Sequence, residues 1–386
     1  MFSNYLEPVS NVTLAHLVLQ SNLSLGHNLI LHTKESGFPK IEGGEIAIIA
    51  IDEDRNALNN IGTGSNLEQV RKEFYQLYPG NWHRKMVDLG TIKKGNDVDD
   101  TYFALKEITT YLLKKNVIIV LLGGGNDLVY ANYRAYDDLE QIVNLVSVDN
   151  KFDLGALDDD LSSETYLHKI IMEKPNNLFS FSNIGYQTFF NSQDEIALIK
   201  SLHFDVYRLG EISQNIALTE PVLRDADIVS IDLGAIKYSE AKANNNASPN
   251  GLTGVDVCAI SRYAGLSDKV SSFGIYEYNS SLDTNHQTAK LMAQLVWYFI
   301  EGVNYRTNDY PFESKEKYIK YIVPIADENR DINFYKSPKS NRWWMEVSTN
   351  NNSTKNALIP CSYQDYLDAC NQDIPNRWLT AFKKLN

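Results

Sequence analysis

Short apolar runs alternate with amphipathic segments through most of this chain. The runs are rich in Ile, Val and Leu, as in strands that are buried on both faces. They fall at 45–51, 85–89, 117–122, 142–148, 178–182, 205–209, 228–231 and 270–276. Helical spacing of apolar residues is found between them, at 67–78, 99–115, 127–139, 163–173, 193–202, 211–224, 254–263 and 284–301. This alternation predicts βαβ units and a mainly parallel sheet.

The predicted fold class is α/β, a three-layer α/β/α sandwich with a sheet of about eight strands. A closed barrel is the alternative, because strand number alone does not exclude it. Residues 1–44 are polar and irregular, with a helical pattern at 14–20, and are interpreted as an N-terminal extension or lid. The α/β domain itself is expected at 45–309.

Residues 310–386 break this rhythm and are interpreted as an appended C-terminal segment. They contain the aromatic stretch 341–347, a low-complexity run at 350–354, and helical patterns at 363–371 and 377–384. We expect the segment to be at least partly ordered, because its Trp and Tyr side chains supply apolar area to bury. The low-complexity run is expected to be a mobile loop.

Composition narrows the classes of function. The formal net charge of the 386 residues is −13 and no basic stripe is present, which argues against nucleic-acid binding. No apolar run is long enough to cross a membrane. The N-terminus lacks the pattern of a signal peptide, and the three cysteines match no zinc module. We therefore expect a cytoplasmic protein without membrane association.

Candidate chemistry gathers where three predicted strands end. The run 143–148 is followed by Asp149 and Asp153, the run 117–122 by the sequence Gly-Gly-Gly-Asn-Asp at 123–127, and the run 228–231 by Asp232. In open α/β sheets, ligands bind in the crevice beyond the carboxyl ends of the strands. These side chains are therefore expected to line one crevice.

The order of these motifs resembles the ureohydrolase family, which comprises arginases, agmatinases and formimidoylglutamases, and is most similar to the formimidoylglutamase branch. The resemblance covers about residues 45 to 300. It implies two manganese ions at the ends of parallel strands and a metal-bound hydroxide that attacks a guanidinium or formimino carbon. The family motifs GGGHE, DxHxD and SxDxD are represented here by GGGND at 123–127, DNKFD at 149–153 and SIDLG at 230–234.

Three of the six ligand positions implied by the resemblance carry a different residue. The carboxylates Asp149, Asp153 and Asp232 remain and would be the metal ligands if a metal binds. The other three positions hold Asn126, Lys151 and Gly234. An ammonium group offers no lone pair to a metal. We therefore expect no bound cofactor, with manganese only if the site is active.

Lys151 is interpreted as a built-in replacement for a metal, within salt-bridge distance of at least one of the three aspartates. A fourth family segment reads Gly-Leu-Thr-Gly-Val-Asp at 251–256. By resemblance, Asp256 stands at the position of an acid that helps to hold the cationic end of the substrate. Asp256 is thus the predicted substrate-binding residue of the crevice.

Three functions follow from these residues. The first is a degenerate ureohydrolase with a non-catalytic binding or scaffold role, motivated by the substituted ligand positions. The second is an active hydrolase of non-peptide C–N bonds in a linear amidine or guanidine, using a reduced metal site. The third is an interaction protein that acts through 310–386. The corresponding partners are a small cationic ligand at the crevice or a protein bound by the C-terminal segment 310–386. The resemblance to the family is also compatible with a homo-oligomer.

Overall fold

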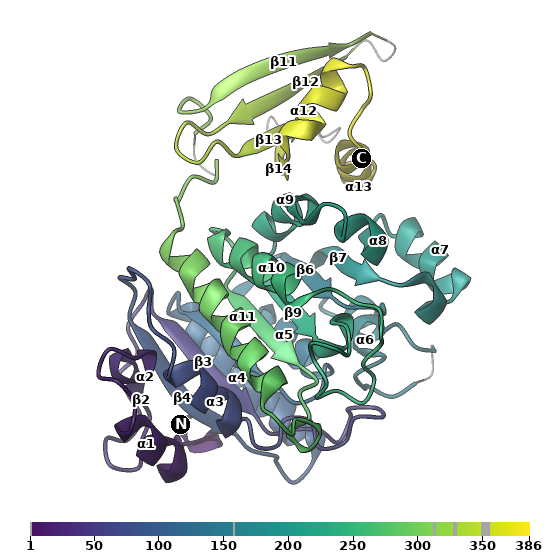
Figure 1. The fold of residues 1–386 in the computed structure, drawn as a ribbon. Coiled ribbons are helices and arrows are strands. Elements are labelled where there is room, and N and C mark those ends of the chain that lie inside the picture. The colour runs from purple at the N-terminus through teal and green to yellow at the C-terminus, as the bar shows by residue number, and fades with distance from the viewer. Residues whose placement is uncertain (1, 157–158, 312–313, 327–329, 349–355) are drawn as a thin grey trace.

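The computed structural model describes residues 2–156, 159–311, 314–326, 330–348 and 356–386. They form a large α/β domain and a smaller C-terminal unit built on a second sheet (Figure 1). The helix α11 (Gln287–Asn304) ends the large domain, and the strand β11 (Ile319–Ile325) begins the smaller unit.

The large sheet has ten strands among the described residues. Nine of them follow one another in the order β1-β4-β3-β5-β10-β9-β6-β7-β8, and β2 pairs with β4. All neighbours are parallel except the pair β1–β4. The bounds are β1 (Leu6–Glu7), β2 (Ile30–Leu31), β3 (Ile46–Ile51), β4 (Met86–Ile92), β5 (Ile118–Leu122), β6 (Val143–Val148), β7 (Leu178–Tyr186), β8 (Asp205–Arg208), β9 (Ile228–Asp232) and β10 (Ser272–Tyr276).

Helices cover both faces of this sheet. One face is covered by α1 (Asn11–Val18), α2 (Leu25–Asn28), α3 (Glu68–Tyr75), α8 (Leu209–Ile212), α9 (Thr219–Arg224), α10 (Gly254–Leu266) and α11. The other is covered by α4 (Val98–Lys114), α5 (Leu128–Arg134), α6 (Tyr166–Met172) and α7 (Gln193–Ser201). Capping boxes begin α4, α7 and α10, each with a carboxylate three residues into the helix.

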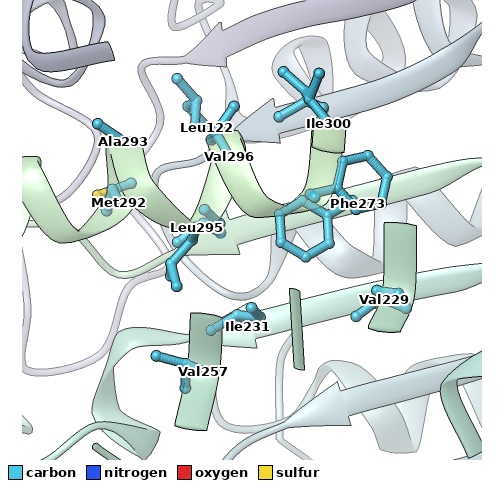
Figure 2. Close-up of a cluster of buried hydrophobic side chains, with 14 of the residues drawn as sticks. Leu122, Val229, Ile231, Val257, Phe273, Met292, Ala293, Leu295, Val296 and Ile300 are labelled. Atoms are coloured by element: carbon cyan, nitrogen blue, oxygen red, sulfur yellow. The ribbon is translucent and has the colours of Figure 1, made fainter. Parts of the chain in front are cut away.

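Alternation along the strands divides the core into two layers. In β3, the side chains of Ile46, Ile48 and Ala50 join one buried cluster, and those of Ala47, Ile49 and Ile51 join the other. Figure 2 shows the first cluster, in which residues of α11 pack on Phe273 of β10 and on the neighbouring strands. The rings of Phe273 and Phe299 stack with a centroid distance of 4.3 Å.

These observations confirm the predicted three-layer sandwich with a mainly parallel sheet. The sheet is open, with β1 and β8 at its edges, so the barrel alternative is wrong. The N-terminal extension is not separate from the sheet, because its residues form β1 and β2. The helical segment expected at 211–224 is interrupted, since α8 and α9 are separate and a 3₁₀ turn lies between them.

The C-terminal unit is a four-stranded antiparallel sheet with two helices. Its order is β11-β12-β13-β14, with bounds β11 (Ile319–Ile325), β12 (Arg330–Lys336), β13 (Trp343–Val347) and β14 (Ala357–Cys361). The helices α12 (Tyr363–Cys370) and α13 (Asn376–Leu385) lie where the helical pattern predicted them. The predicted mobile loop at 350–354 lies outside the described residues.

One arginine of the large domain anchors the C-terminal unit to it. The side chain of Arg224 on α9 donates hydrogen bonds to the carbonyls of Trp343 and Cys361, at 2.9 and 3.0 Å. Its guanidinium carbon lies 4.8 Å from the ring centroid of Trp344. Both Arg224 and Trp344 are buried. The unit is therefore packed firmly against the end of the large domain at α9 (Figure 1).

A search of the described helices for a membrane-spanning segment finds none that is both long and apolar enough.

Candidate functional site

Four adjacent central strands end at one polar crevice. In the order β5-β10-β9-β6, they are followed or ended by Asn126, Glu277, Asp232 and Asp149 respectively. Because parallel strands deliver their carboxyl ends to the same edge, residues far apart in sequence meet there. The crevice is lined by ten residues, among them Asp149, Lys151, Asp153, Asp232, Gly234 and Glu277.

Asn126 follows the glycine turn after β5. At Gly124, a Cβ atom would lie 1.7 Å from the carbonyl oxygen of Glu53, so only glycine fits that close approach. The turn places the Asn126 amide nitrogen beside two carboxylates, 3.3 Å from Asp149 Oδ2 and 3.1 Å from Asp153 Oδ2. The side-chain oxygen of Asn126 is buried and has no hydrogen-bond partner among the described residues.

Asp149 and Asp153 sit on the loop after β6, as predicted. Asp149 Oδ1 accepts a hydrogen bond from the backbone N–H of Lys151, and Asp153 has a positive φ of 54°. Asn191 ties this loop to the loop after β7. Its Oδ1 accepts from the N–H of Phe152, and its Nδ2 donates to the carbonyls of Asn150 and Gln187.

Asp232 is the last residue of β9. Its Oδ1 accepts hydrogen bonds from the backbone N–H of Gly234 at 2.5 Å and from Asn244 Nδ2 at 3.5 Å. Gly234 lines the crevice with backbone atoms only. A Cβ atom at Gly234 would lie 2.9 Å from Asp232 Oδ1, so a side chain there requires Asp232 to shift.

Glu277 is a residue of the crevice that sequence reasoning missed. It follows β10 directly, is buried, and adopts a positive φ of 69°. Its Oε1 accepts from the backbone N–H of Asn126 at 2.8 Å, and its Oε2 accepts from Asn60 Nδ2 at 2.7 Å. Glu277 could have been predicted from the sequence by the same pattern as the aspartates, because it is a carboxylate immediately after a buried apolar run.

Burial dominates the electrostatics of these acids. Burial raises the pKa of Asp149, and burial together with the charges of Asp149 and Asp232 raises that of Asp153 well above its ordinary value. The pKa of Asp232 is raised by burial and by the charges of Asp149 and Glu277. Burial also raises the pKa of Glu277, to about 8. The crevice therefore favours either protonated carboxyls or an added cation.

The prediction that Lys151 forms a salt bridge with one of the three aspartates is wrong. Lys151 Nζ lies 2.6 Å from Glu164 Oε1, and this ion pair is the one found for Lys151 among the described residues. Each side chain of the pair is about one-third exposed, at 32% and 33%. The physical reason is solvation, because an ammonium near the surface needs only one carboxylate and keeps its contact with water.

The prediction that Asp256 lines the crevice is also wrong. Asp256 Oδ2 accepts hydrogen bonds from the backbone N–H and the hydroxyl of Thr253, at 2.9 and 2.8 Å. This is the capping box at the start of α10, and Asp256 is not among the residues that line the crevice. Its position is therefore explained by helix capping.

The free space in the crevice is small. Its volume is about 20 Å³, which is enough for one water molecule or one ion and too little for an amino acid. In the part of the chain that the structure describes, no three His, Cys, Asp or Glu side chains are placed so as to hold one metal ion. Lys151 and Glu164 also line this space, so their ion pair narrows its mouth.

Comparison with known proteins assigns the chain to a family. A model of the arginase family matches residues 45–301, the segment that contains all four strand ends of the crevice. The chain belongs to the arginase family. It is 24% identical over 268 residues to a formimidoylglutamase of Staphylococcus haemolyticus, covering 66% of this chain and 85% of that protein. A Staphylococcus aureus formimidoylglutamase is 27% identical over 260 residues, and the match covers 64% of this chain and 82% of that protein.

Solved structures of arginase-family proteins have the same fold. A formiminoglutamase of Trypanosoma cruzi with manganese superposes with a TM-score of 0.63 at 18% identity, covering 68% of this chain and 94% of that chain. The formimidoylglutamase of Bacillus subtilis also superposes with a TM-score of 0.63 at 18% identity, and the match covers 71% of this chain and 93% of that chain. The family match ends at residue 301, before the sheet of the C-terminal unit begins. The chain is thus an arginase-family domain, similar to formimidoylglutamases, with additional C-terminal structure.

Proposed function

We propose that this arginase-family protein has a degenerate two-manganese site and acts as a non-catalytic binding protein. One observation carries the proposal. The groups beside the three aspartates are hydrogen-bond donors or lack a side chain, whereas a second metal ion requires further ligands. Asn126 donates its amide hydrogen to Asp149 and Asp153, and Lys151 carries an ammonium engaged with Glu164.

The donor set does not fit two manganese ions. Asp149, Asp153 and Asp232 provide three carboxyl groups, while Gly234 provides backbone atoms alone. Two dications carry four positive charges, so the three aspartates and Glu277 would all have to be ionised to balance them, although burial raises the pKa of each. Unit charges about 4 Å apart repel by roughly 4 kcal/mol at an effective dielectric of about 20. No hydrolytic step on a two-metal centre is therefore derived for this chain.

The same residues fit a single small cation better. The free volume of about 20 Å³ accommodates one ion, Asp149 and Asp153 are buried, and no ion pair is found for these two or for Asp232 among the described residues. The unpartnered oxygen of Asn126 supplies an independent argument. Turning this amide by half a rotation exchanges its nitrogen and oxygen and presents the oxygen to the crevice. Carboxylate and amide oxygens are ligands suited to hard divalent cations.

Metal stoichiometry tests the proposal directly. Manganese is titrated into the chelator-treated protein by calorimetry, and the bound metal is then counted by elemental analysis. We expect at most one ion per chain, and its loss in Asp232→Asn. In parallel, release of formamide or urea from formimidoylglutamate, arginine and agmatine is measured, and no turnover is expected. Tight binding of two ions together with turnover would refute the proposal.

An active hydrolase with a reduced metal site is the second candidate. The retention of three carboxylates and the unpartnered Asn126 oxygen favour it, because both would serve one catalytic ion. To hold one ion together with Asn126, the carboxyls of Asp149, Asp153 and Asp232 would have to move closer to one another than they lie in this structure, and the bound ion would then supply an activated water. Turnover that appears with one equivalent of manganese and disappears in Asp232→Asn would select this candidate.

A protein-binding role of 310–386 is the third candidate. In the described part of the C-terminal sheet, β11 pairs only with β12, so one edge of β11 is free. Ile319 and Ile322 on this strand are 49% and 57% exposed. Exposed apolar side chains on an edge strand favour pairing with another chain. Loss of a co-purifying partner in Ile322→Lys, with the fold retained, would support this role.

A further inference from the structure

A second cavity lies beside the crevice, where β7 and β8 end. Its volume is about 430 Å³, which is within the range of small-molecule sites. It is lined by Tyr186 and the loop that follows it, by Arg208 and the start of α8, and by residues of the loop between β9 and α10. Tyr186 and Arg208 face each other across the paired ends of β7 and β8. The cavity shares no lining residue with the crevice.

The charge of this cavity is opposite to that of the crevice. Its described lining contains two cationic side chains, Arg208 and Lys237, and no carboxylate. Arg208 has no ion-pair partner among the described residues, whereas Lys237 Nζ lies 3.3 Å from Glu240 Oε1. Glu211, three residues after Arg208, lines a different cavity. The chain as a whole carries a net charge of −13, so a cavity lined by two cationic side chains and no carboxylate is a local exception.

The other side chains that line the cavity suit the carbon skeleton of a small organic ligand. Tyr186 and Phe189 provide aromatic surface, and Phe189 is 70% exposed, which is unusual for a large apolar side chain. Gln187 and Asn250 provide amide groups, and Gln187 Nε2 donates to the Asn250 carbonyl at 3.0 Å, which holds two walls of the cavity together. Cationic groups together with aromatic faces match a ligand with anionic head groups and a short carbon chain.

We propose that this cavity binds a small organic dianion, a dicarboxylate or a phosphate monoester, with Arg208 as its principal charged contact and Lys237 as the second. Arg208 presents a planar fork of N–H donors that suits two oxygens of one anionic group. Lys237 contributes less, because Glu240 already neutralises part of its charge. Two cations favour a dianion over a monoanion of the same length. Dianion binding here does not require a metal ion or a ligand in the crevice.

Calorimetry on the full chain with matched probes tests this proposal. Glutarate and glycerol phosphate represent the two sources of dianion, and pentanoate is the monoanion matched in length to glutarate. We expect at least one dianion to bind about tenfold more tightly than pentanoate, since the second charge adds a charge-assisted contact. Raising NaCl from about 50 mM to about 500 mM should weaken the binding. The tighter dianion identifies the class of head group.

Three variants assign the binding to this cavity. Arg208→Gln is expected to weaken dianion binding about tenfold or more, and Lys237→Gln to weaken it by a smaller factor. Lys200→Gln, an exposed lysine on α7 outside the cavity, is the matched control and should have no effect. Absence of dianion binding at about 10 mM, or equal binding in Arg208→Gln, would overturn the proposal.

Discussion

Lys151 Nζ lies 2.6 Å from Glu164 Oε1, at the mouth of a crevice that contains three aspartates. The ammonium thus finds its partner outside the acidic cluster that it was expected to neutralise. Its charge still acts on the cluster at longer range, because it opposes the rise in the pKa values of Asp149 and Asp153. The ion pair partly covers the crevice, and the ammonium of Lys151 weakly offsets the negative charge of the aspartates.

Removing Lys151 should improve binding of a single cation. In Lys151→Met the repulsive ammonium is lost, and we expect the affinity for manganese to rise about tenfold, equivalent to about 1.4 kcal/mol. The stability of the fold should change by less than about 1 kcal/mol, because the pair is partly exposed. Calorimetry and urea unfolding measure the two quantities. Glu164→Gln is the matched control, since it frees the ammonium to approach the aspartates and should not increase affinity.

Restoring ligands should convert the proposed single-ion site into a two-ion site. The triple variant Asn126→His, Lys151→His and Gly234→Asp supplies two imidazoles and a fourth carboxylate. We expect the manganese stoichiometry to rise to two ions per chain, whereas Lys151→His alone should not reach two. The new side chain at 234 needs Asp232 to move, because the Cβ atom would lie 2.9 Å from Asp232 Oδ1. Two bound ions in the single variant would contradict this expectation.

Asp127 should make stability depend on pH. It is fully buried, one Oδ accepts from the Tyr102 hydroxyl at 2.6 Å, and burial raises the pKa of its carboxyl to about 7. The folded state therefore retains a proton that the unfolded state releases above about pH 4. The free energy of unfolding should fall by about 3 kcal/mol from this group as the pH rises from about 5 to about 8.

Asp127→Asn isolates this contribution. The amide stays uncharged at every pH, so the variant should lose about 3 kcal/mol less stability than the parent protein over the same interval. Urea unfolding of metal-free protein at both pH values measures the difference. Glu277 contributes in the same direction in both proteins, and its share is smaller in the variant because the charge of Asp127 is one of the causes that raise the pKa of Glu277. Parallel pH profiles would show that Asp127 is ionised in the folded state across this range.

Arg224 should determine how firmly the C-terminal unit is attached. Arg224→Ala removes hydrogen bonds to two carbonyls and the contact with Trp344, leaving buried acceptors unpaired. We expect the free energy of unfolding to fall by about 3–5 kcal/mol, as when one partner of another buried charged pair is removed. Arg224→Lys keeps the charge without the fork of donors and should recover only part of it. Limited proteolysis within 305–318 should accelerate in Arg224→Ala, and an unchanged cleavage rate would count against this attachment.

The strands of the large sheet were predictable because they are continuous apolar runs. The pairs Leu6–Glu7 and Ile30–Leu31 were not, since a two-residue strand carries no periodicity and exists only by pairing with β4. The strands of the C-terminal sheet were missed for a related reason. Their burial depends on packing against α12, α13 and α9, and their sequences mix apolar and charged residues.

At the site, backbone placement was predictable and side-chain direction was not. The positions of Asp149, Asp153 and Asp232 followed from the ends of strands. The partner of Lys151 depends on Glu164, thirteen residues away in sequence, and a rotamer cannot be read from a motif. For Asp256 a competing signal was present, because Thr253 and Asp256 have the spacing of a capping box. Local helix chemistry there outweighed the family pattern.

Asn191 connects the loops that line the two cavities. One amide side chain holds Phe152 and Asn150 on the crevice loop and Gln187 on the wall of the neighbouring cavity. A ligand that moves one loop relative to the other must stretch the hydrogen bonds to Phe152 and Asn150, because Asn191 and Gln187 lie on the same loop. If both proposed sites are occupied by ligands that strain these bonds, linkage would make each occupant change the affinity of the other by the same factor.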